Sequence, residues 1–188
     1  MAWISNWHLK IIKKVLEKSG TIAYPTETLW GIGCRASDYV AAKRLLAIKH
    51  RSITKGLIVL AANPEQIAPW LNIEATDYVD QISAYKVPTT TLLPASRYAP
   101  IWLTGQYQSI AVRFTQHPLA FKLCEHFGPL ISTSANISER HHAISRFQVI
   151  QRFRNLIDFI VPGLSGNEIA GTIGASHIVD WQSQKRLR

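Results

Sequence analysis

Residues 21–33 read TIAYPTETLWGIG, and this stretch organises the rest of the chain. Its apolar triplet IAY favours a strand, which the following proline would end. Three polar side chains come next, Thr26, Glu27 and Thr28, before apolar residues return in LWGIG. A strand that delivers two hydroxyls and a carboxylate to its end is typical of a functional site. An ordinary turn between two strands explains the segment equally well.

Strands and helices alternate along the chain outside this stretch. Helical periodicity or capping signals predict helices over residues 38–49, 75–84, 118–127 and 146–153, a first helix capped by Ser5 or Asn6, and a short helix that begins at Pro64. Ser37 is the expected cap of the second helix. Apolar or β-branched runs predict strands over 21–24, 57–61, 89–93, 109–114, 130–132, 159–161 and 177–180, with 29–34 extended. This order predicts one α/β domain over residues 1–188, in which the sheet can be mixed.

Composition narrows the choice of partners. A hydrophobic fraction of 47% indicates a folded protein, and a formal charge of +9 with a pI near 9.8 indicates an anionic partner. Nucleotide phosphates, RNA or both satisfy that charge. Cys34 and Cys124 have no metal-binding or redox spacing, so we expect buried thiols in a reducing compartment. The N-terminus lacks a secretion signal and no apolar run approaches membrane-spanning length, which predicts a soluble, cytoplasmic protein with no membrane partner.

Several familiar motifs do not fit this chain. Gly31-Ile32-Gly33 lacks the third glycine of a dinucleotide fingerprint, and residues 166–172 lack the lysine of a phosphate-binding loop. The pair His141-His142 has no companion ligands at metal-binding spacing, so no metal site is expected. No nucleophile elbow surrounds Ser134 or its neighbours, which argues against a serine hydrolase.

Two groups of polar residues remain as a candidate site. Lys49, Arg51 and Lys55 are separated by even offsets, so on an extended chain they would point the same way and could hold a triphosphate. A solvated basic loop is the alternative interpretation.

Arg113 lies inside an otherwise apolar strand, where a charge needs a partner or a ligand, and its guanidinium suits a carboxylate. The STSAN segment at 132–136 offers hydroxyls and an amide just after a strand, where α/β sheets bind ligands. A polar turn is the competing interpretation of that segment.

Four segments together resemble a known family. YPTET followed by G-x-G, then KHRSITKGL, LTGQYQSIAVRFTQHP and PLISTSANIS, occur in the order seen in the YrdC/TsaC family of threonylcarbamoyl-AMP synthases. The resemblance runs from the first helix to about Asp180. It implies a twisted, mixed α/β fold with a basic concave face, in the short, single-domain bacterial form. It also implies synthesis of threonylcarbamoyl-adenylate and pyrophosphate from L-threonine, bicarbonate and ATP, for modification of the adenosine next to the anticodon in certain tRNAs.

The resemblance assigns a nucleotide-binding role to five residues. Lys49 and Arg51, the implied catalytic pair, would hold the ATP phosphates together with Lys55, and Mg²⁺ would share the charge. Ser134 and Asn136 would also bind the nucleotide. The implied partners are ATP, L-threonine, bicarbonate, and tRNA either directly or through a transfer complex.

Four further residues would bind threonine: Thr28, Arg113, Ser132 and, with a weaker match, Ser176. Arg113 would hold the carboxylate. The chain departs from the usual W-P-G-P segment, which here reads Tyr85-Lys86-Val87-Pro88, so one wall of the site can differ. Two other interpretations remain: a non-catalytic protein that binds tRNA or rRNA, and a paralogue with a changed reaction.

Overall fold

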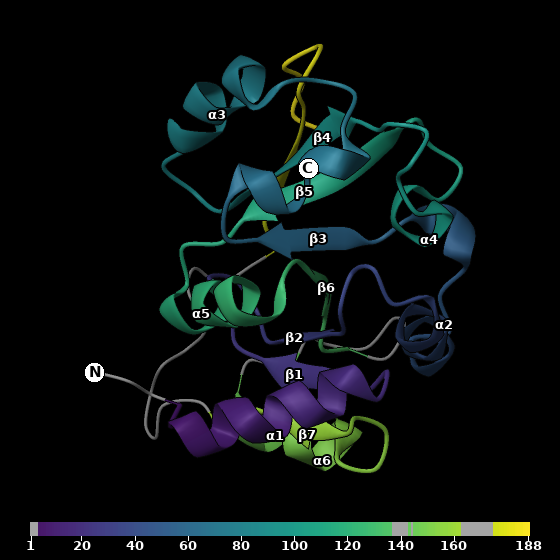
Figure 1. The fold of residues 1–188 in the computed structure, drawn as a ribbon, viewed down its shortest axis with the longest axis vertical. Coiled ribbons are helices and arrows are strands. Elements are labelled where there is room, and N and C mark those ends of the chain that lie inside the picture. Colours follow the sequence, from purple (N-terminus) through teal and green to yellow (C-terminus); the bar gives the residue numbers. More distant parts are fainter. Residues whose placement is uncertain (1–3, 137–142, 144, 163–174) are drawn as a thin grey trace.

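The computed structural model describes residues 4–136, 143, 145–162 and 175–188. Its centre is a mixed sheet with the strand order β7-β1-β2-β6-β3-β5-β4-β8 among these residues (Figure 1). The strands are β1 (Ile22–Tyr24), β2 (Gly31–Gly33), β3 (Ile58–Ala61), β4 (Thr89–Pro94), β5 (Ser109–Phe114), β6 (Leu130–Ser134), β7 (Phe159–Ile160) and β8 (His177–Asp180). The pairs β1–β7, β3–β5 and β4–β8 are parallel, and the other pairs are antiparallel. The expected mixed α/β fold is confirmed.

Helices cover both faces of this sheet. They are α1 (Asn6–Glu17), α2 (Tyr39–Ile48), α3 (Ala75–Ser83), α4 (Ile101–Thr104), α5 (Pro118–Phe127) and α6 (Arg146–Phe153), with single 3₁₀ turns η1 (Ile53–Lys55), η2 (Pro64–Gln66) and η3 (Ala68–Trp70). In Figure 1, α1 and α5 lie in front of the lower strands, and α2 lies to the right below α4. No described helix is long and apolar enough to cross a membrane.

The alternation of side chains along each strand divides the apolar core into two layers. Leu60 of β3 and Leu130 of β6 pack with α1 and α5, together with Ile12 of α1 and Leu123 of α5. Their neighbours on the same strands point to the opposite face, where the larger cluster contains α2. The polar pocket described below lies on the face that α5 covers only in part.

The strands β2 and β6 approach each other closely because β2 carries glycine. A Cβ atom on Gly33 would lie 1.7 Å from the carbonyl oxygen of Ile131, so no other residue fits there without moving the backbone. The Tyr24 hydroxyl donates to the same carbonyl at 3.0 Å, and burial raises the pKa of that hydroxyl. The second glycine of the G-x-G therefore allows the two strands to approach this closely.

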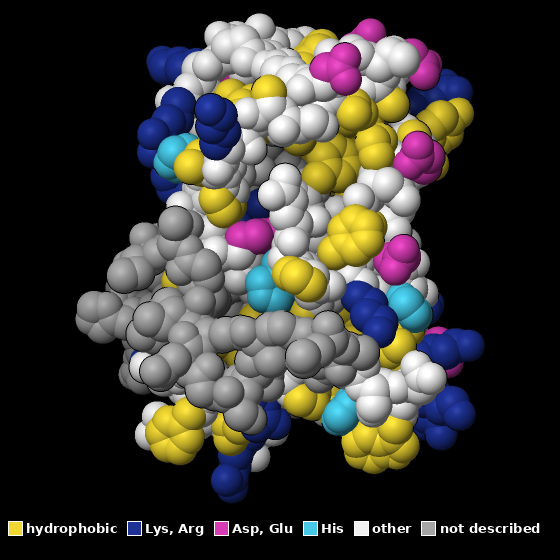
Figure 2. Space-filling model, turned by 90° about the vertical axis from the view of Figure 1, so that its left-hand side faces the viewer, with side chains coloured by type: hydrophobic (Ala, Val, Ile, Leu, Met, Phe, Trp, Pro, Cys, Tyr) yellow, Lys and Arg dark blue, Asp and Glu magenta, His cyan; other side chains and the backbone are white. Residues whose placement is uncertain are grey.

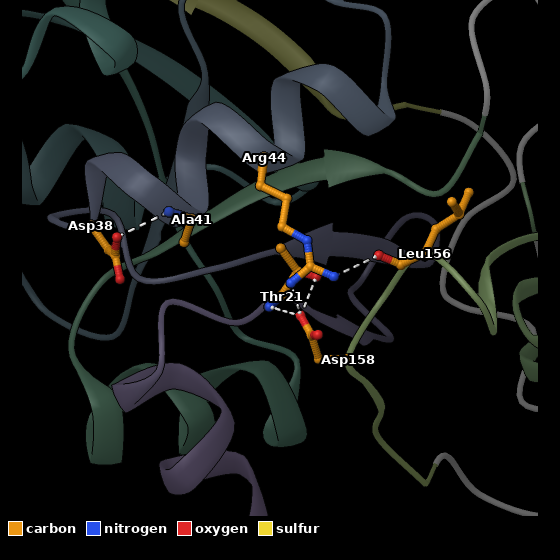
Figure 3. Close-up of polar contacts among 6 residues, drawn as sticks. All are labelled: Thr21, Asp38, Ala41, Arg44, Leu156 and Asp158. Carbon is orange, nitrogen blue, oxygen red and sulfur yellow. Dashed lines mark hydrogen bonds and ion pairs between the residues drawn. The ribbon is translucent and has the colours of Figure 1, made fainter.

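A polar clamp joins α2 to the start of β1 and to the chain before β7 (Figure 3). Arg44 forms an ion pair with Asp158 at 2.7 Å and donates to the Leu156 carbonyl. The same Asp158 carboxylate accepts from the Thr21 N–H at 2.8 Å and from the Thr21 hydroxyl at 3.0 Å. Two segments more than 130 residues apart are thus held by one carboxylate.

Most element boundaries agree with the sequence-based predictions, with one capping error. The cap of α2 is Asp38, whose side chain accepts from the Ala41 N–H at 3.0 Å, and not Ser37 (Figure 3). Ser5 caps α1, Ser145 caps α6, and helix α5 has the predicted ends. Cys34 and Cys124 are buried thiols as expected, and burial raises the pKa of Cys124 to about 12. His141-His142 and residues 166–172 lie outside the described residues.

Candidate functional site

A cavity of about 460 Å³ opens on the sheet face next to α5. Strand β5 contributes every second residue, Ser109, Ala111 and Arg113, while Ile110 and Val112 between them enter the apolar core. The neighbouring strand β3 contributes Ile58 to the cavity wall, and its Leu60, which pairs with Arg113, belongs to the apolar core. Strand periodicity alone therefore turns Arg113 toward the cavity.

Arg113 is almost completely buried, with 6% of its surface exposed. Its Nη1 donates to the Thr28 hydroxyl at 3.3 Å, and both residues line the cavity together with Ser132. Burial lowers the pKa of Arg113, while the charge of Glu27 acts in the opposite direction. A guanidinium remains charged under such conditions, so the cavity contains a desolvated cation ready for an anionic group. These three residues, all predicted to bind threonine, thus line one cavity.

Ser176, the fourth, lies on another wall of the same cavity. It is buried, and its hydroxyl lies 2.9 Å from the Thr90 hydroxyl of β4. Arg188 donates from Nε to the Ser176 carbonyl at 3.1 Å, and both Leu187 and Arg188 line the cavity. Sequence analysis missed these last two residues, because a short RLR segment far from the other motifs carries no local signal.

Lys49 lies behind the cavity, where it holds the segment that follows β6. Its Nζ donates to the Ser134 carbonyl at 2.7 Å, and to the Asn136 carbonyl and side-chain oxygen. Ser134 in turn donates to the Asn136 side chain at 2.9 Å. Burial, with a smaller contribution from Arg51, lowers the pKa of Lys49 to about 8. Ser134 lines the cavity, whereas neither Lys49 nor Asn136 is among its lining residues.

Arg51 and Lys55 line the cavity at the loop before β3. Arg51 donates to the Gly56 carbonyl at 3.0 Å, and burial lowers its pKa. Residues 49–55 do not form the extended chain on which the even offsets would align the three cations. Lys49 ends α2, His50 has a φ of 49°, and the Ser52 side chain caps the 3₁₀ turn that contains Lys55. Arg51 and Lys55 share the cavity because of that turn and not because of strand periodicity.

The described residues offer no protein-built metal site. No group of three His, Cys, Asp or Glu side chains is placed to hold a metal ion in the described ranges, and no Asp or Glu is among the described residues that line the cavity. Mg²⁺ prefers oxygen ligands and commonly binds through substrate phosphates. The residues present therefore fit Mg²⁺ only as a companion of a bound nucleotide.

Charged side chains of both signs are mixed on the face shown in Figure 2. Lysine and arginine gather at the upper left and along the lower edge, and acidic side chains lie among them at the top and right. On the visible part of this face the positive charge of the protein is therefore not concentrated in one patch.

Comparison with known proteins identifies the family to which this chain belongs. The family model Sua5_yciO_yrdC, described as "Telomere recombination", matches residues 14–188. The chain belongs to the Sua5/YciO/YrdC family. This family includes a protein named threonylcarbamoyl-AMP synthase from Stutzerimonas stutzeri, 41% identical over 186 residues, which is 98% of each chain. A protein of the same name from Nitrosococcus oceani is 39% identical over 97% of this chain and 98% of its own length.

Solved structures of the Sua5/YciO/YrdC family share the fold. P. abyssi Sua5, whose crystal structure contains L-threonine, superposes with a TM-score of 0.82 at 29% identity over 95% of this chain and 53% of that one. E. coli YciO superposes with a TM-score of 0.80 at 18% identity, over 97% of this chain and 88% of that one, and so shows the fold alone.

Proposed function

We propose that this protein is a threonylcarbamoyl-AMP synthase, which forms threonylcarbamoyl-adenylate and pyrophosphate from L-threonine, bicarbonate and MgATP. One observation carries the proposal: a buried arginine suited to a carboxylate and two cations suited to phosphates line the same cavity. The names of the relatives and the threonine-bound family structure support the same reaction.

The spacing along β3 suits the two substrates. Arg51 contacts Gly56, two residues before β3 begins, whereas Arg113 pairs with Leu60. Gly56 and Leu60 are four residues apart, which corresponds to roughly 13 Å along an extended chain. Ser132 pairs with Ile58 between them. When the threonine carboxylate binds Arg113, the threonine amine would point along β3 toward Arg51 and Lys55, where the phosphates would bind.

The chemistry requires orientation and charge neutralisation more than a protein nucleophile. Threonine and bicarbonate form a carbamate and water. A carbamate oxygen then bonds to the α-phosphorus of ATP as the bond to the pyrophosphate oxygen breaks, so the enzyme is a nucleotidyltransferase. Arg51 and Lys55 would stabilise the charge that develops on phosphorus and pyrophosphate. Mg²⁺ bound to the phosphates would share that charge.

Lys49 and Asn136 would affect nucleotide binding indirectly, because neither is among the residues that line the cavity. Their contacts fix Ser134, whose hydroxyl lies on the cavity wall. We further propose that the labile product serves tRNA modification in the cytoplasm, with tRNA reached directly or through a transfer complex.

Pyrophosphate release tests the proposal. Purified protein is supplied with MgATP and assayed with and without bicarbonate and L-threonine, and with L-serine as a control that lacks only the methyl group. We expect release that requires both bicarbonate and threonine. If folded protein releases none, the synthase assignment fails, and salt-dependent tRNA binding would then test the non-catalytic RNA-binding alternative.

A further inference from the structure

The Glu27 carboxylate joins the turn that carries Thr28 to the end of β5. Its Oε1 accepts from the Thr115 hydroxyl at 2.5 Å, from the Gln116 N–H at 2.6 Å and from the His117 N–H at 3.1 Å. These three donors directly follow Phe114, the last residue of β5. Any shift of Glu27 would therefore move the strand end on which Arg113 is held.

The second oxygen of Glu27 has a different environment. Oε2 is buried and has no hydrogen-bond partner among the described residues, and the same holds for Nε of Arg113. Both residues line a second, small cavity of about 70 Å³. The wall of this cavity includes Tyr85, whose buried hydroxyl also lacks a hydrogen-bond partner in the described part of the chain. A polar space of this size accommodates bridging water.

Glu27 and Arg113, which both line this small cavity, interact electrostatically. Burial alone would raise the pKa of Glu27, but the Arg113 charge and the donors on Oε1 outweigh it and hold the pKa below its usual range. Glu27 is thus an anion beside a buried cation. The main cavity itself is lined by Arg51, Lys55, Arg113 and Arg188, and no Asp or Glu is among its described lining residues.

Because four cations line one cavity, the site has to distinguish a polyphosphate from the carboxylate that binds at Arg113. A polyphosphate is attracted to every one of them, including the arginine that has to remain open for a carboxylate. A carboxylate behind Arg113, outside the cavity, reduces the attraction at that point and leaves the donors of the guanidinium available. The same carboxylate fixes the strand end, so position and charge are set by one side chain.

We propose that Glu27 is a positioning and specificity residue: it holds Arg113 for the threonine carboxylate and offsets its charge, so that phosphate groups are directed to Arg51 and Lys55. This inference rests on the proposed function and adds a residue that selects which anion binds at Arg113.

The test uses Glu27→Gln in the full-length protein. The amide oxygen can still accept from the Thr115 hydroxyl and the two N–H groups, whereas the negative charge is removed. We expect the KM values for threonine and ATP to change less than about twofold when no pyrophosphate is added, because the contacts that position Arg113 are kept. Inorganic pyrophosphate should become a markedly stronger inhibitor, competitive with threonine. Glu65→Gln, the same change at an exposed carboxylate on η2, should leave all three quantities unchanged.

A second variant separates position from charge. Glu27→Asp keeps the charge but shortens the side chain, so the KM for threonine should rise while pyrophosphate inhibition stays close to wild type. Thermal unfolding of each variant shows whether the fold is kept. Pyrophosphate inhibition that is unchanged in folded Glu27→Gln, or an equal rise in the KM for threonine and for ATP in folded Glu27→Asp, would overturn the proposal. Wild-type protein that releases no pyrophosphate would instead refute the proposed reaction.

Discussion

Replacing Lys49 by methionine distinguishes two roles of this cation: support of the segment that carries Ser134, and direct contact with the ATP phosphates. The change removes the ammonium group but keeps an unbranched apolar side chain of similar length. It takes away the donor to the carbonyls of Ser134 and Asn136 and to the Asn136 side chain. Breaking a buried charged contact of this kind costs about 3–5 kcal/mol, and relief from burying the charge offsets part of it. We expect a net loss of about 3 kcal/mol, or roughly 6–12 °C in Tm for a chain of this length.

Thermal unfolding and ATP calorimetry are measured together, with Lys55→Met as the matched control. Lys55 is exposed and lines the cavity, so its replacement should weaken ATP binding without lowering Tm. Lys49→Met should lower both, since the segment that carries Ser134 loses its support. If Lys49→Met has the same Tm as the wild type but no longer binds ATP, then Lys49 contacts phosphate directly and its positioning role is wrong.

Three further outcomes follow from the same geometry. Arg113→Lys keeps the charge but loses the planar fork, so the KM for threonine should rise about tenfold or more with little change for ATP, and an equal rise would contradict the assignment. Because the pKa of Lys49 lies near 8, ATP affinity measured by calorimetry without threonine should fall as pH rises through 8, and an affinity that is flat across that range would count against it. Burial would raise the pKa of Asp158, but its contacts outweigh this and lower it. Its stabilising effect is therefore full above about pH 4 and lost as pH falls through the lowered pKa. Asp158→Ala should cost roughly 1–2 kcal/mol near pH 7, solvent screening included, and unfolding curves that keep this gap at pH 2 would refute it.

The elements that sequence predicted well are those fixed by local signals. Helix α5 has a proline at its first position and a glycine after its last residue, and strand β5 has an apolar run from Ile110 to Phe114 that only Arg113 interrupts. Capping was less certain, because Ser37 and Asp38 are adjacent and either side chain can accept the same N–H groups. The structure alone showed that Asp38 does so.

The parts of the site that sequence did not predict depend on contacts between distant residues. The course of the chain around Arg51 is set by a left-handed His50 and a serine cap, neither of which has a periodic signature. Arg188 reaches the cavity because the last residues pair with β8. Glu27 was visible as a polar residue in the first motif, but its partners follow about 90 positions later. Pairings at that separation leave no pattern in a single sequence.

The place of β6 in the sheet determines when the cavity can form during synthesis. This five-residue strand lies between β2 and β3, and among the described strands it joins the β7-β1-β2 group to the β3-β5-β4-β8 group. Thr28 comes before β2 in the first group, and Arg113 belongs to the second. On the ribosome, the paired strands β1 and β2 wait for roughly a hundred further residues, or about 5–20 s, before β6, the second partner of β2, emerges. Until residue 134 has been made, the edge of β2 that later pairs with β6 stays unpaired, and an unpaired strand edge of this kind favours aggregation.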